Sequence, residues 1–410
     1  MFLIRVAKST GSEGLVKVII SGAGIGGLTA ALCSIHHGHD VTVLERATEL
    51  GEIGAGIQVS PNAMKVFEAL GLGAALAANA FRPEGIEARM GISGRYIFKI
   101  PLAERAIKNW GSPYLHIYRP DYIEVLLKAV KDKGGDIVRL NHEVTGYEQT
   151  ADSVTAKLTN GRQISGDVLI GADGIHSPTR TQMLGAEKPQ FTGNVAWRAV
   201  VPMEKLGEDI PNPTACAWMG PGRHCVTYRL RGGKLANLVA VVERDDWTKE
   251  SWTEKGTAEE ALADFKGWNS TIINIIKNAQ TLYRWALFDR PPLERWVDGR
   301  VVLLGDAAHP MLPFMAQGAA MAVEDAWVVA KTLSEPNAKI EEALKIYQGL
   351  RYGRTSHVQA VSRDNAKIFH QSSRLGQIKT YGPMWLAGKI VPAAIHKRQN
   401  YLYGHDVTQL

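Results

Sequence analysis

Hydrophobic residues recur along this chain with two different spacings, which predict where strands and helices lie. Val16–Ile20 is a short, mostly apolar and β-branched run, as expected for a buried strand. Gly26–His37 then has helical spacing, and Asp40–Glu45 is again strand-like. The chain therefore opens as a strand–helix–strand unit, which is typical of a parallel sheet covered by helices.

The middle of the chain has a different pattern. A helical segment at Tyr122–Lys133 is followed by short strands at Ile137–Leu140, Val154–Leu158 and Val168–Ile170. From about residue 194 to residue 243, strand-like segments follow one another without helical spacing between them. Because parallel strands need long crossovers, this region predicts an antiparallel sheet, inserted as a second domain.

Helical spacing returns in the last third of the chain. It predicts two short helices, a buried strand and a longer helix, at Ala258–Phe265, Thr271–Asn278, Val301–Leu304 and about Gln317–Leu333. The tail from Ala338 is helical and polar on one face. Within it, the apolar segment Pro383–Ile395 is interrupted by Lys389 and predicts a docking helix.

Composition and charge exclude several classes of protein. The length of 410 residues favours two or three domains, and 45% hydrophobic with 21% charged residues excludes a disordered chain. The formal charge of +6 comes without basic runs interleaved with aromatic residues, so we expect no nucleic-acid partner. A mild positive field would instead attract an anionic substrate and a phosphorylated cofactor.

Cysteines and apolar segments bear on the compartment. Cys33, Cys216 and Cys225 form neither a CxxC pair nor a Cys/His ligand spacing, so we expect no disulfide framework and no metal site. The apolar stretch within the first 14 residues is too short for a signal peptide, and the sequence contains no run of about 18 apolar residues that could span a membrane. The sequence thus predicts a cytoplasmic protein without a membrane partner.

The first motif with chemical meaning follows the first strand. In Gly22-Ala23-Gly24-Ile25-Gly26-Gly27, Gly22 allows a tight turn, Gly24 lets a pyrophosphate approach, and Gly27 lets the helix pack closely. The second strand ends in Glu45, whose carboxylate can bind a ribose diol. The alternative is a plain tight turn with a surface glutamate, but the complete strand–turn–helix–strand context favours a dinucleotide.

Two further strands end in comparable turns. Val168–Gly171 leads into Ala172-Asp173-Gly174, which alone could be a strand end closed by an aspartate. Val301–Leu304 leads into Gly305-Asp306, and an aspartate there can bind a sugar or ribityl hydroxyl. Gly318 and Ala319 then open a new helix, whose first N–H groups form a positive dipole end.

These three motifs, in this order, resemble those of the single-component flavoprotein monooxygenases related to p-hydroxybenzoate hydroxylase. The resemblance runs from Val16 to about Leu350. It is closest to the salicylate, 3-hydroxybenzoate and 6-hydroxynicotinate hydroxylases, which share stretches like Gly51–Asn62 and Gly305–Asp325. It implies an α/β fold with an FAD-binding Rossmann-like (GxGxxG) domain, an inserted antiparallel β-sheet substrate domain and a helical C-terminal tail.

The resemblance also implies which residues bind FAD. The glycine turn would hold the pyrophosphate, Glu45 the adenosine ribose and Asp306 the ribityl chain, while the helix at Gly318 would point at the flavin pyrimidine edge. The full implied set is Gly22, Gly24, Gly26, Gly27, Glu45, Arg46, Arg119, Val144, Asp173, Asp306, Pro313, Gly318 and Ala319. Val144 would lie near the adenine, Asp173 would serve FAD and pyridine-nucleotide use, and Pro313 would shape the loop over the flavin.

The implied reaction is hydroxylation of a small phenolic or hydroxypyridine carboxylic acid. NADH or NADPH reduces FAD, and O₂ then forms a flavin C4a-hydroperoxide, whose electrophilic distal oxygen is attacked by an electron-rich ring. Two alternatives remain open: a flavin monooxygenase acting on a larger aromatic substrate, and a non-catalytic FAD-binding protein.

His224 and Tyr228 are the candidates for the substrate pocket. On a strand they face the same way, whereas Cys225 faces the other way, which disfavours a Cys–His nucleophile. By the resemblance, His224 would deprotonate the ring hydroxyl and Tyr228 would orient the substrate. The alternative is a strand histidine satisfied by a backbone carbonyl. Arg198 is a possible clamp for a substrate carboxylate, and His309 belongs more plausibly to the flavin loop.

We expect the domains to be discontinuous. The predicted FAD-binding domain comprises 15–87, 112–190 and 289–335, and the substrate domain 88–111 and 191–288. Residues 1–14 would form a flexible extension and 336–410 a C-terminal helical region. A homodimer is implied by the resemblance alone.

Overall fold

The computed structural model describes all residues except 1–14, 52–53, 188, 245–253 and 391–395. The predicted flexible extension and the end of the predicted docking helix therefore lie outside the described residues. The main sheet has six strands in the order β18-β19-β11-β1-β2-β7, all parallel except the edge strand β18. Their bounds are β1 Lys17–Ser21, β2 Asp40–Leu44, β7 Val138–Arg139, β11 Val168–Gly171, β18 Val297–Asp298 and β19 Val301–Leu303.

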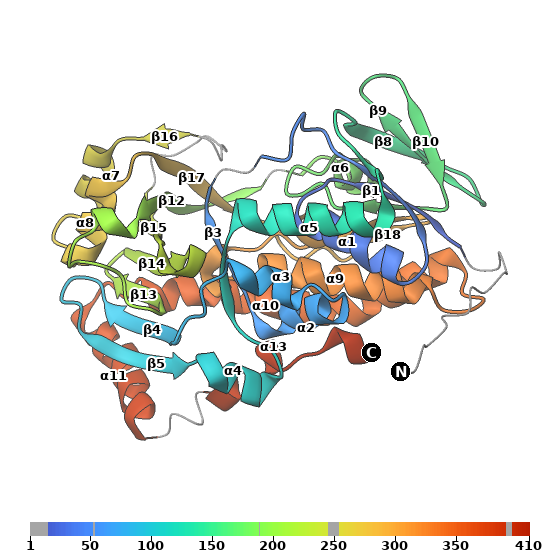
Figure 1. The fold of residues 1–410 in the computed structure, drawn as a ribbon. Coiled ribbons are helices and arrows are strands. Elements are labelled where there is room, and N and C mark those ends of the chain that lie inside the picture. The colour runs from blue at the N-terminus through green and yellow to red at the C-terminus, as the bar shows by residue number, and fades with distance from the viewer. Residues whose placement is uncertain (1–14, 52–53, 188, 245–253, 391–395) are drawn as a thin grey trace.

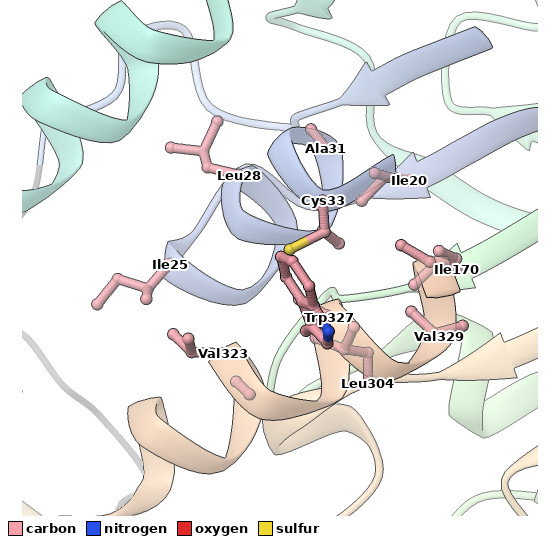
Figure 2. Close-up of a cluster of buried hydrophobic side chains, with 14 of the residues drawn as sticks. Ile20, Ile25, Leu28, Ala31, Cys33, Ile170, Leu304, Val323, Trp327 and Val329 are labelled. Atoms are coloured by element: carbon pink, nitrogen blue, oxygen red, sulfur yellow. The ribbon is translucent and has the colours of Figure 1, made fainter. Parts of the chain in front are cut away.

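Helices α1 (Ile25–His36), α5 (Arg119–Gly134) and α9 (Gly318–Leu333) pack beside this sheet. Figure 2 shows apolar side chains of α1 and α9, among them Leu28, Cys33, Val323 and Trp327, in the core around these helices. The two helices can approach closely because a Cβ on Gly26 would lie only 2.9 Å from Leu304 and 3.3 Å from Ala322. The remaining helices of this part are α2 Pro61–Ala69, α3 Gly73–Ala78, α4 Ala103–Trp110 and α6 Pro178–Leu184.

A second sheet of eight strands lies beside this body (Figure 1), in the order β16-β17-β12-β15-β14-β13-β4-β5. Every neighbouring pair in it is antiparallel except β13 with β4. Its strands are β4 Gly85–Met90, β5 Tyr96–Pro101, β12 Gln190–Pro202, β13 Ala215–Gly220, β14 Arg223–Leu230, β15 Leu235–Glu243, β16 Lys255–Gly256 and β17 Leu282–Asp289.

The two faces of this sheet have different partners. Strand alternation places Trp197 and Cys225 on the face covered by α7 (Ala258–Asp264) and α8 (Ser270–Asn278), where Phe265 completes an apolar cluster. The neighbouring positions Ala196 and Val241 face the other way and pack against Phe314. That second face therefore meets the loop that leads into α9.

Two smaller pairings complete the sheets. Strands β8 (Val144–Gln149), β9 (Val154–Leu158) and β10 (Gln163–Gly166) form an antiparallel three-stranded sheet. Strands β3 (Gly56–Val59) and β6 (Leu115–Tyr118) form an antiparallel ribbon next to β14.

The C-terminal region is helical, with α10 Ile340–Phe369, α11 Arg374–Ile390 and α13 Asn400–Tyr403. The α/β class and the helical tail predicted from the sequence are thus confirmed. α11 lies against β5. Among the described residues, no helix is both long enough and apolar enough to cross a membrane.

Candidate active site

The turn between β1 and α1 has the geometry that its glycines predicted. Gly22 has a φ of +104°, which favours glycine, and a Cβ there would lie 2.5 Å from the carbonyl oxygen of Ala172. A Cβ on Gly27 would collide with the carbonyl oxygen of Gly22. At Gly24, no described atom lies within 4 Å of the Cβ position. The turn is therefore tight on its inner side and open where a phosphate group could approach.

Glu45, directly after β2, reaches back to this turn. One carboxylate oxygen accepts a hydrogen bond of 2.7 Å from the backbone N–H of Ala23, and the other accepts one of 2.9 Å from Ala47. An ionised carboxylate has about four acceptor positions, so it keeps capacity for ribose hydroxyls. Arg46 beside it is exposed.

Val144 begins β8, and its buried side chain belongs to the main core. The segment before it is fixed to the end of β2, because the backbone N–H of His142 donates to the carbonyl oxygen of Glu45 at 2.8 Å. Val144 thus follows a contact with the predicted ribose-binding residue. Its place near an adenine stays a prediction.

Asp173 fastens the turn after β11 to the glycine turn. Its Oδ2 accepts a hydrogen bond of 2.7 Å from the hydroxyl of Thr179 and one of 3.4 Å from the hydroxyl of Ser21. A Cβ on Gly22 would lie 3.2 Å from the Cα of Asp173, so the two turns touch. Burial raises the pKa of this carboxyl, while hydrogen bonds from Ser177 and Thr179 oppose the rise. Its part in cofactor or pyridine-nucleotide binding stays a prediction.

Asp306 faces the start of α9. A Cβ on Gly318, the first residue of α9, would lie 3.8 Å from Oδ1 of Asp306. The side chain of Asp306 is exposed at one side, but protein atoms surround the rest of it, and this desolvation raises its pKa. The charges of His309, Arg119 and Arg180 lower the pKa. The charge of Arg119 therefore acts on Asp306 although the two residues lie far apart in the sequence. Two predicted FAD residues, Asp306 and Gly318, therefore lie together, and a third, Arg119, acts on Asp306 through its charge.

The N-terminus of α9 is open. Among the described residues, no side chain caps this helix, because the side-chain oxygen of Gln317 at the N-cap position instead accepts from the amide of Asn62 at 3.3 Å. The first N–H groups of the helix, including those of Gly318 and Ala319, have no intrahelical acceptor. The exposed Pro313 begins the 3₁₀ turn η4 (Pro313–Met315) that precedes them. Such a helix end stabilises negative charge.

A buried ion network fixes this loop to the helices behind it. Nε2 of His309 lies 2.5 Å from Asp325, and Nε of Arg351 lies 2.7 Å from the other oxygen of that carboxylate. Arg351 also contacts Glu324 at 2.6 Å, and Arg354 does so at 2.7 Å. Burial alone would raise the pKa of Glu324, but the two arginines lower it to about 2. His309 is thereby engaged in the loop scaffold, as its predicted structural role requires.

His224 on β14 faces the same loop. Its ring centroid lies 5.0 Å from Phe314 and 5.0 Å from Phe369, the last residue of α10. Its Nδ1 lies 2.6 Å from Nε2 of His370. Burial and the neighbouring His370 hold the pKa of His224 well below its ordinary value. Its Nδ1 contacts a second histidine, not the backbone carbonyl considered as an alternative.

Tyr228 lies further along the same face of β14. Its ring centroid is 4.8 Å from that of His116, and the ring covers Gly56 on β3. Burial raises the pKa of Tyr228, although Arg198 lowers it, so the phenol stays protonated and can donate a hydrogen bond. The guanidinium of Arg198 lies 4.4 Å from the ring centroid of Trp285, so Arg198 is within electrostatic reach of Tyr228.

Sequence reasoning missed the residues that support these side chains. Asn62 donates to Glu324 at 2.6 Å and to Gln317 at 3.3 Å, and so joins the stretches 51–62 and 305–325. In the sequence, both stretches stood out only by their resemblance to the family. His370 and Glu243 were missed altogether, because each is a single polar residue far from His224 in sequence. Only the family-like stretches could have served as a signal, and they do not include His370.

Comparisons with known proteins identify the family of the chain. A model of the FAD binding domain family matches residues 15–359. The chain is 39% identical over 394 residues to 3-hydroxybenzoate 6-hydroxylase 1 of Aquipseudomonas alcaligenes, covering 96% of this chain and 98% of that one. It is 36% identical over 354 residues to 6-hydroxynicotinate 3-monooxygenase of Pseudomonas fluorescens, covering 85% and 91%. A salicylate hydroxylase–substrate complex matches with a TM-score of 0.80 at 26% identity, covering 97% of each chain.

These matches confirm the family, the FAD cofactor and the enzyme class expected from the sequence. FAD is the cofactor, with NADH or NADPH as the reductant. The relatives named above are, by their names, a hydroxylase and a monooxygenase of small aromatic acids. The family model alone spans most of the chain. The chain therefore belongs to the FAD binding domain family, as an FAD-dependent aromatic-ring monooxygenase.

Proposed function

We propose that this enzyme hydroxylates a small phenolic or hydroxypyridine carboxylic acid. The observation that carries the proposal is the contact of His224 with Phe314 at 5.0 Å between ring centroids. Phe314 belongs to the turn that leads into the open N-terminus of α9. A proton acceptor and the candidate flavin-binding helix end therefore meet in one place. The relatives act, by their names, on 3-hydroxybenzoate, 6-hydroxynicotinate and salicylate.

The chain has suitable groups for each part of an FAD molecule. The open backbone at Gly24 would take the pyrophosphate and Glu45 the adenosine ribose, with Arg46 and Val144 nearby. Arg119 and Asp306 would take the ribityl side, since Asp306 lies 3.8 Å from a Cβ position on Gly318. Gly318 and Ala319 would present their N–H groups to the flavin ring, and Pro313 would shape the loop above it. Bound FAD supplies the oxygen transfer that no side chain can perform.

In this proposal His224 is the general base. A phenol has a pKa near 10 and an imidazole one of about 6.5, so removal of the proton needs a neutral imidazole and a stabilised anion. Burial keeps His224 neutral. The deprotonated ring is electron-rich, which an electrophilic oxygen transfer requires.

Tyr228 would orient the substrate and Arg198 would bind its carboxylate. Tyr228 stays protonated because burial raises its pKa, and it can therefore donate to the phenolate. The guanidinium of Arg198 lies over the ring of Trp285, within electrostatic reach of that hydroxyl. A planar guanidinium is well suited to bind a carboxylate.

Stopped-flow reduction of the bound flavin tests the proposal. NADH and NADPH are each mixed with the holoenzyme, with and without salicylate, 3-hydroxybenzoate or 6-hydroxynicotinate. Faster bleaching with one acid, together with a hydroxylated product, supports the proposal and identifies the reductant. If none of the acids accelerates reduction, a larger aromatic substrate takes their place. If no substrate of either size does, a non-catalytic FAD-binding role is favoured.

The compartment and the assembly also remain proposals. Cys33, Cys216 and Cys225 are buried free thiols, as is common in the reducing cytoplasm. Homodimer formation rests on the family resemblance alone, and light scattering of the holoenzyme would test it.

A further inference from the structure

A row of three polar side chains leads from His224 to the protein surface. Nδ1 of His224 lies 2.6 Å from Nε2 of His370, and Nδ1 of His370 lies 2.8 Å from Oε1 of Glu243. Exposure rises along the row: His224 is 1% exposed, the side chain of His370 4% and that of Glu243 54%. The row therefore connects a buried ring nitrogen with a carboxylate in contact with solvent.

Secondary structure holds this row in place. His224 on β14 pairs with Val241 on β15, and Glu243 follows two residues later on the same face of the sheet. The backbone N–H of Glu243 also donates to the carbonyl oxygen of Gly222 at 2.9 Å. The row thus crosses two adjacent strands.

His370 comes from the end of α10, which is fixed on two sides. Its backbone N–H donates to the carbonyl oxygen of Ala366 at 3.1 Å and ends the helix. The hydroxyl of Tyr381, on α11, donates to the carbonyl oxygen of Ile368 at 3.0 Å. The ring of Phe369 packs against His224. The backbone that carries His370 is therefore fixed beside His224.

We propose that His224, His370 and Glu243 form a proton relay that carries the substrate proton from the pocket to solvent. The inference rests on the proposed function, in which His224 is the base. His370 and Glu243 touch neither substrate nor cofactor in this scheme, and act as positioning residues through His224.

The carboxylate of Glu243 determines the order of the hydrogens. It can only accept, so Nδ1 of His370 carries the hydrogen, and Nε2 of a neutral His370 is bare. The hydrogen in the contact between the two rings must then belong to Nδ1 of His224. Nε2 of a neutral His224 is consequently bare, which is the form that a general base needs. A half-exposed glutamate thus fixes the tautomer of a buried histidine two groups away.

Proton transfer along the row balances. Nε2 of His224 accepts the proton of the ring hydroxyl, and Nδ1 passes its proton to Nε2 of His370. Nδ1 of His370 passes its proton to Glu243, which gives it to water. One proton enters and one leaves, no bond other than N–H and O–H changes, and the reverse sequence restores both rings.

Other charged groups nearby are directed elsewhere. Arg223 and Arg244 flank the row on β14 and after β15, but both point to the opposite face and contact Asp264. On α10, Lys367 pairs with Asp364 at 3.2 Å on the exposed side. Desolvation lowers the pKa of His370, and the charge of Glu243 opposes this. Within the described part of the chain, the titratable group that acts on His224 is His370.

The order of hydrogens can be tested without any substrate. Long-range ¹H–¹⁵N correlation of the ¹⁵N-histidine-labelled holoenzyme reports which nitrogen of each ring is protonated. We expect hydrogen on Nδ1 of both His224 and His370, and loss of this preference at His224 in Glu243→Gln. Hydrogen on Nε2 of His224 in the wild type would overturn the relay. Because this result needs no turnover, it is independent of whether the proposed substrates are correct.

Turnover then tests the transfer itself, with 3-hydroxybenzoate and 6-hydroxynicotinate as probes. His370→Gln and Glu243→Gln should lower kcat by about tenfold or more, with KM changed less than about twofold. In the pH profile of kcat, His370→Gln should also lose the decrease at low pH that a relay group contributes. Added imidazole should restore part of the rate to His370→Gln. His357→Gln, an exposed histidine on the same helix, should behave as the wild type.

Two outcomes separate the relay from the proposed function. If the wild type turns over a probe and both relay variants keep its kcat and pH profile, the relay is overturned and the proposed function stands. Absence of turnover in the wild type with either probe would overturn the proposed substrates, and the tautomer measurement would still decide the relay. Glu243 is half exposed, so Glu243→Gln keeps the test open should His370→Gln fail to fold.

Discussion

His224 shows how much a single side chain depends on its surroundings. It combines a neutral, buried ring with contacts to Phe314 and His370. We expect His224→Ala to retain FAD, because the residue is not among the proposed cofactor ligands. Hydroxylation should slow by about 10²–10⁴-fold, and more of the NAD(P)H consumed should end as peroxide. Product and peroxide assays on the purified variant measure this, with His357→Ala as the control. Unchanged coupled turnover would remove His224 from the role of base.

A second buried histidine links stability to pH. His116 on β6 is fully buried, and desolvation lowers its pKa to about 3. The unfolded chain binds a proton at this residue near pH 6.5, whereas the folded chain does not until much lower pH. The stabilising contribution is therefore fully present above about pH 6.5 and is lost as the pH falls towards 3.

His116→Phe should remove this dependence. Phenylalanine keeps an aromatic ring beside Phe81 and cannot titrate. Between pH 7 and pH 5 the wild type should lose about 2 kcal/mol more unfolding free energy than the variant. Urea unfolding at both pH values, with excess FAD, measures the difference, and exposed His357→Phe serves as the control. Equal losses in wild type and His116→Phe would show that folding does not lower the pKa of His116.

At the scale of elements, α9 and α10 are joined by charge as well as by apolar packing. Arg351 has no exposed surface and contacts both Glu324 and Asp325. Arg351→Met removes the cation and leaves part of this buried negative charge uncompensated. We expect a loss of about 3–5 kcal/mol in unfolding free energy, and a shifted α9 N-terminus with weaker FAD binding. Thermal unfolding and FAD titration measure both effects.

The matched control for this variant is an exposed ion pair. Lys128 contacts Asp132 at 2.5 Å, one turn apart on α5, and its side chain is 74% exposed. Lys128→Met should therefore change stability little, since solvent screens the pair. A similar loss in both variants would mean that burial does not determine the effect of these pairs.

Elements with a strong local pattern were predicted closely, and elements that depend on tertiary contacts were not. The strand predicted at Val154–Leu158 has those bounds, and the helix predicted at Gly26–His37 is Ile25–His36. The ribbon of β3 and β6 was not predicted. Strands of four residues are too short to show a clear alternation of polar and apolar side chains, and these two are stabilised by pairing with each other.

The candidate site divides in the same way. Gly22, Gly24 and Asp306 could be proposed as cofactor-binding residues from the sequence because turn geometry and phosphate chemistry restrict the residue type at a strand end. The contact between the Gly22 turn and the Asp173 turn could not be predicted, since it depends on how the sheet orders its strands. The row from His224 to Glu243 had no local signal, because it joins β14, β15 and the end of α10.

For the whole molecule, the decisive contact is the one between its two sheet systems. The β3–β6 ribbon packs against β14, and the backbone N–H of Gly56 donates to the side-chain oxygen of Asn237 on β15 at 2.8 Å. The ring of Tyr228 covers Gly56, and its hydroxyl would lie 2.7 Å from a Cβ there. The position of Tyr228 in the proposed pocket therefore depends on the glycine at position 56 of β3, which has no side chain to occupy the place of the tyrosine ring.

Gly56→Ala tests whether this contact positions the substrate. The added methyl group overlaps the ring of Tyr228, which must move, whereas the glycine turn and the α9 N-terminus are untouched. We expect unchanged FAD content, a KM for the accepted acid raised by about tenfold and a lower kcat, because small displacements of a positioning group weaken alignment. Gly349→Ala on α10, where no described atom lies within 4 Å of the Cβ position, is the control and should be neutral or slightly stabilising. If Gly56→Ala instead keeps the wild-type KM and kcat, Tyr228 does not orient the substrate. The layers would then meet there for packing alone, and Arg198 would be the next residue to test for substrate binding.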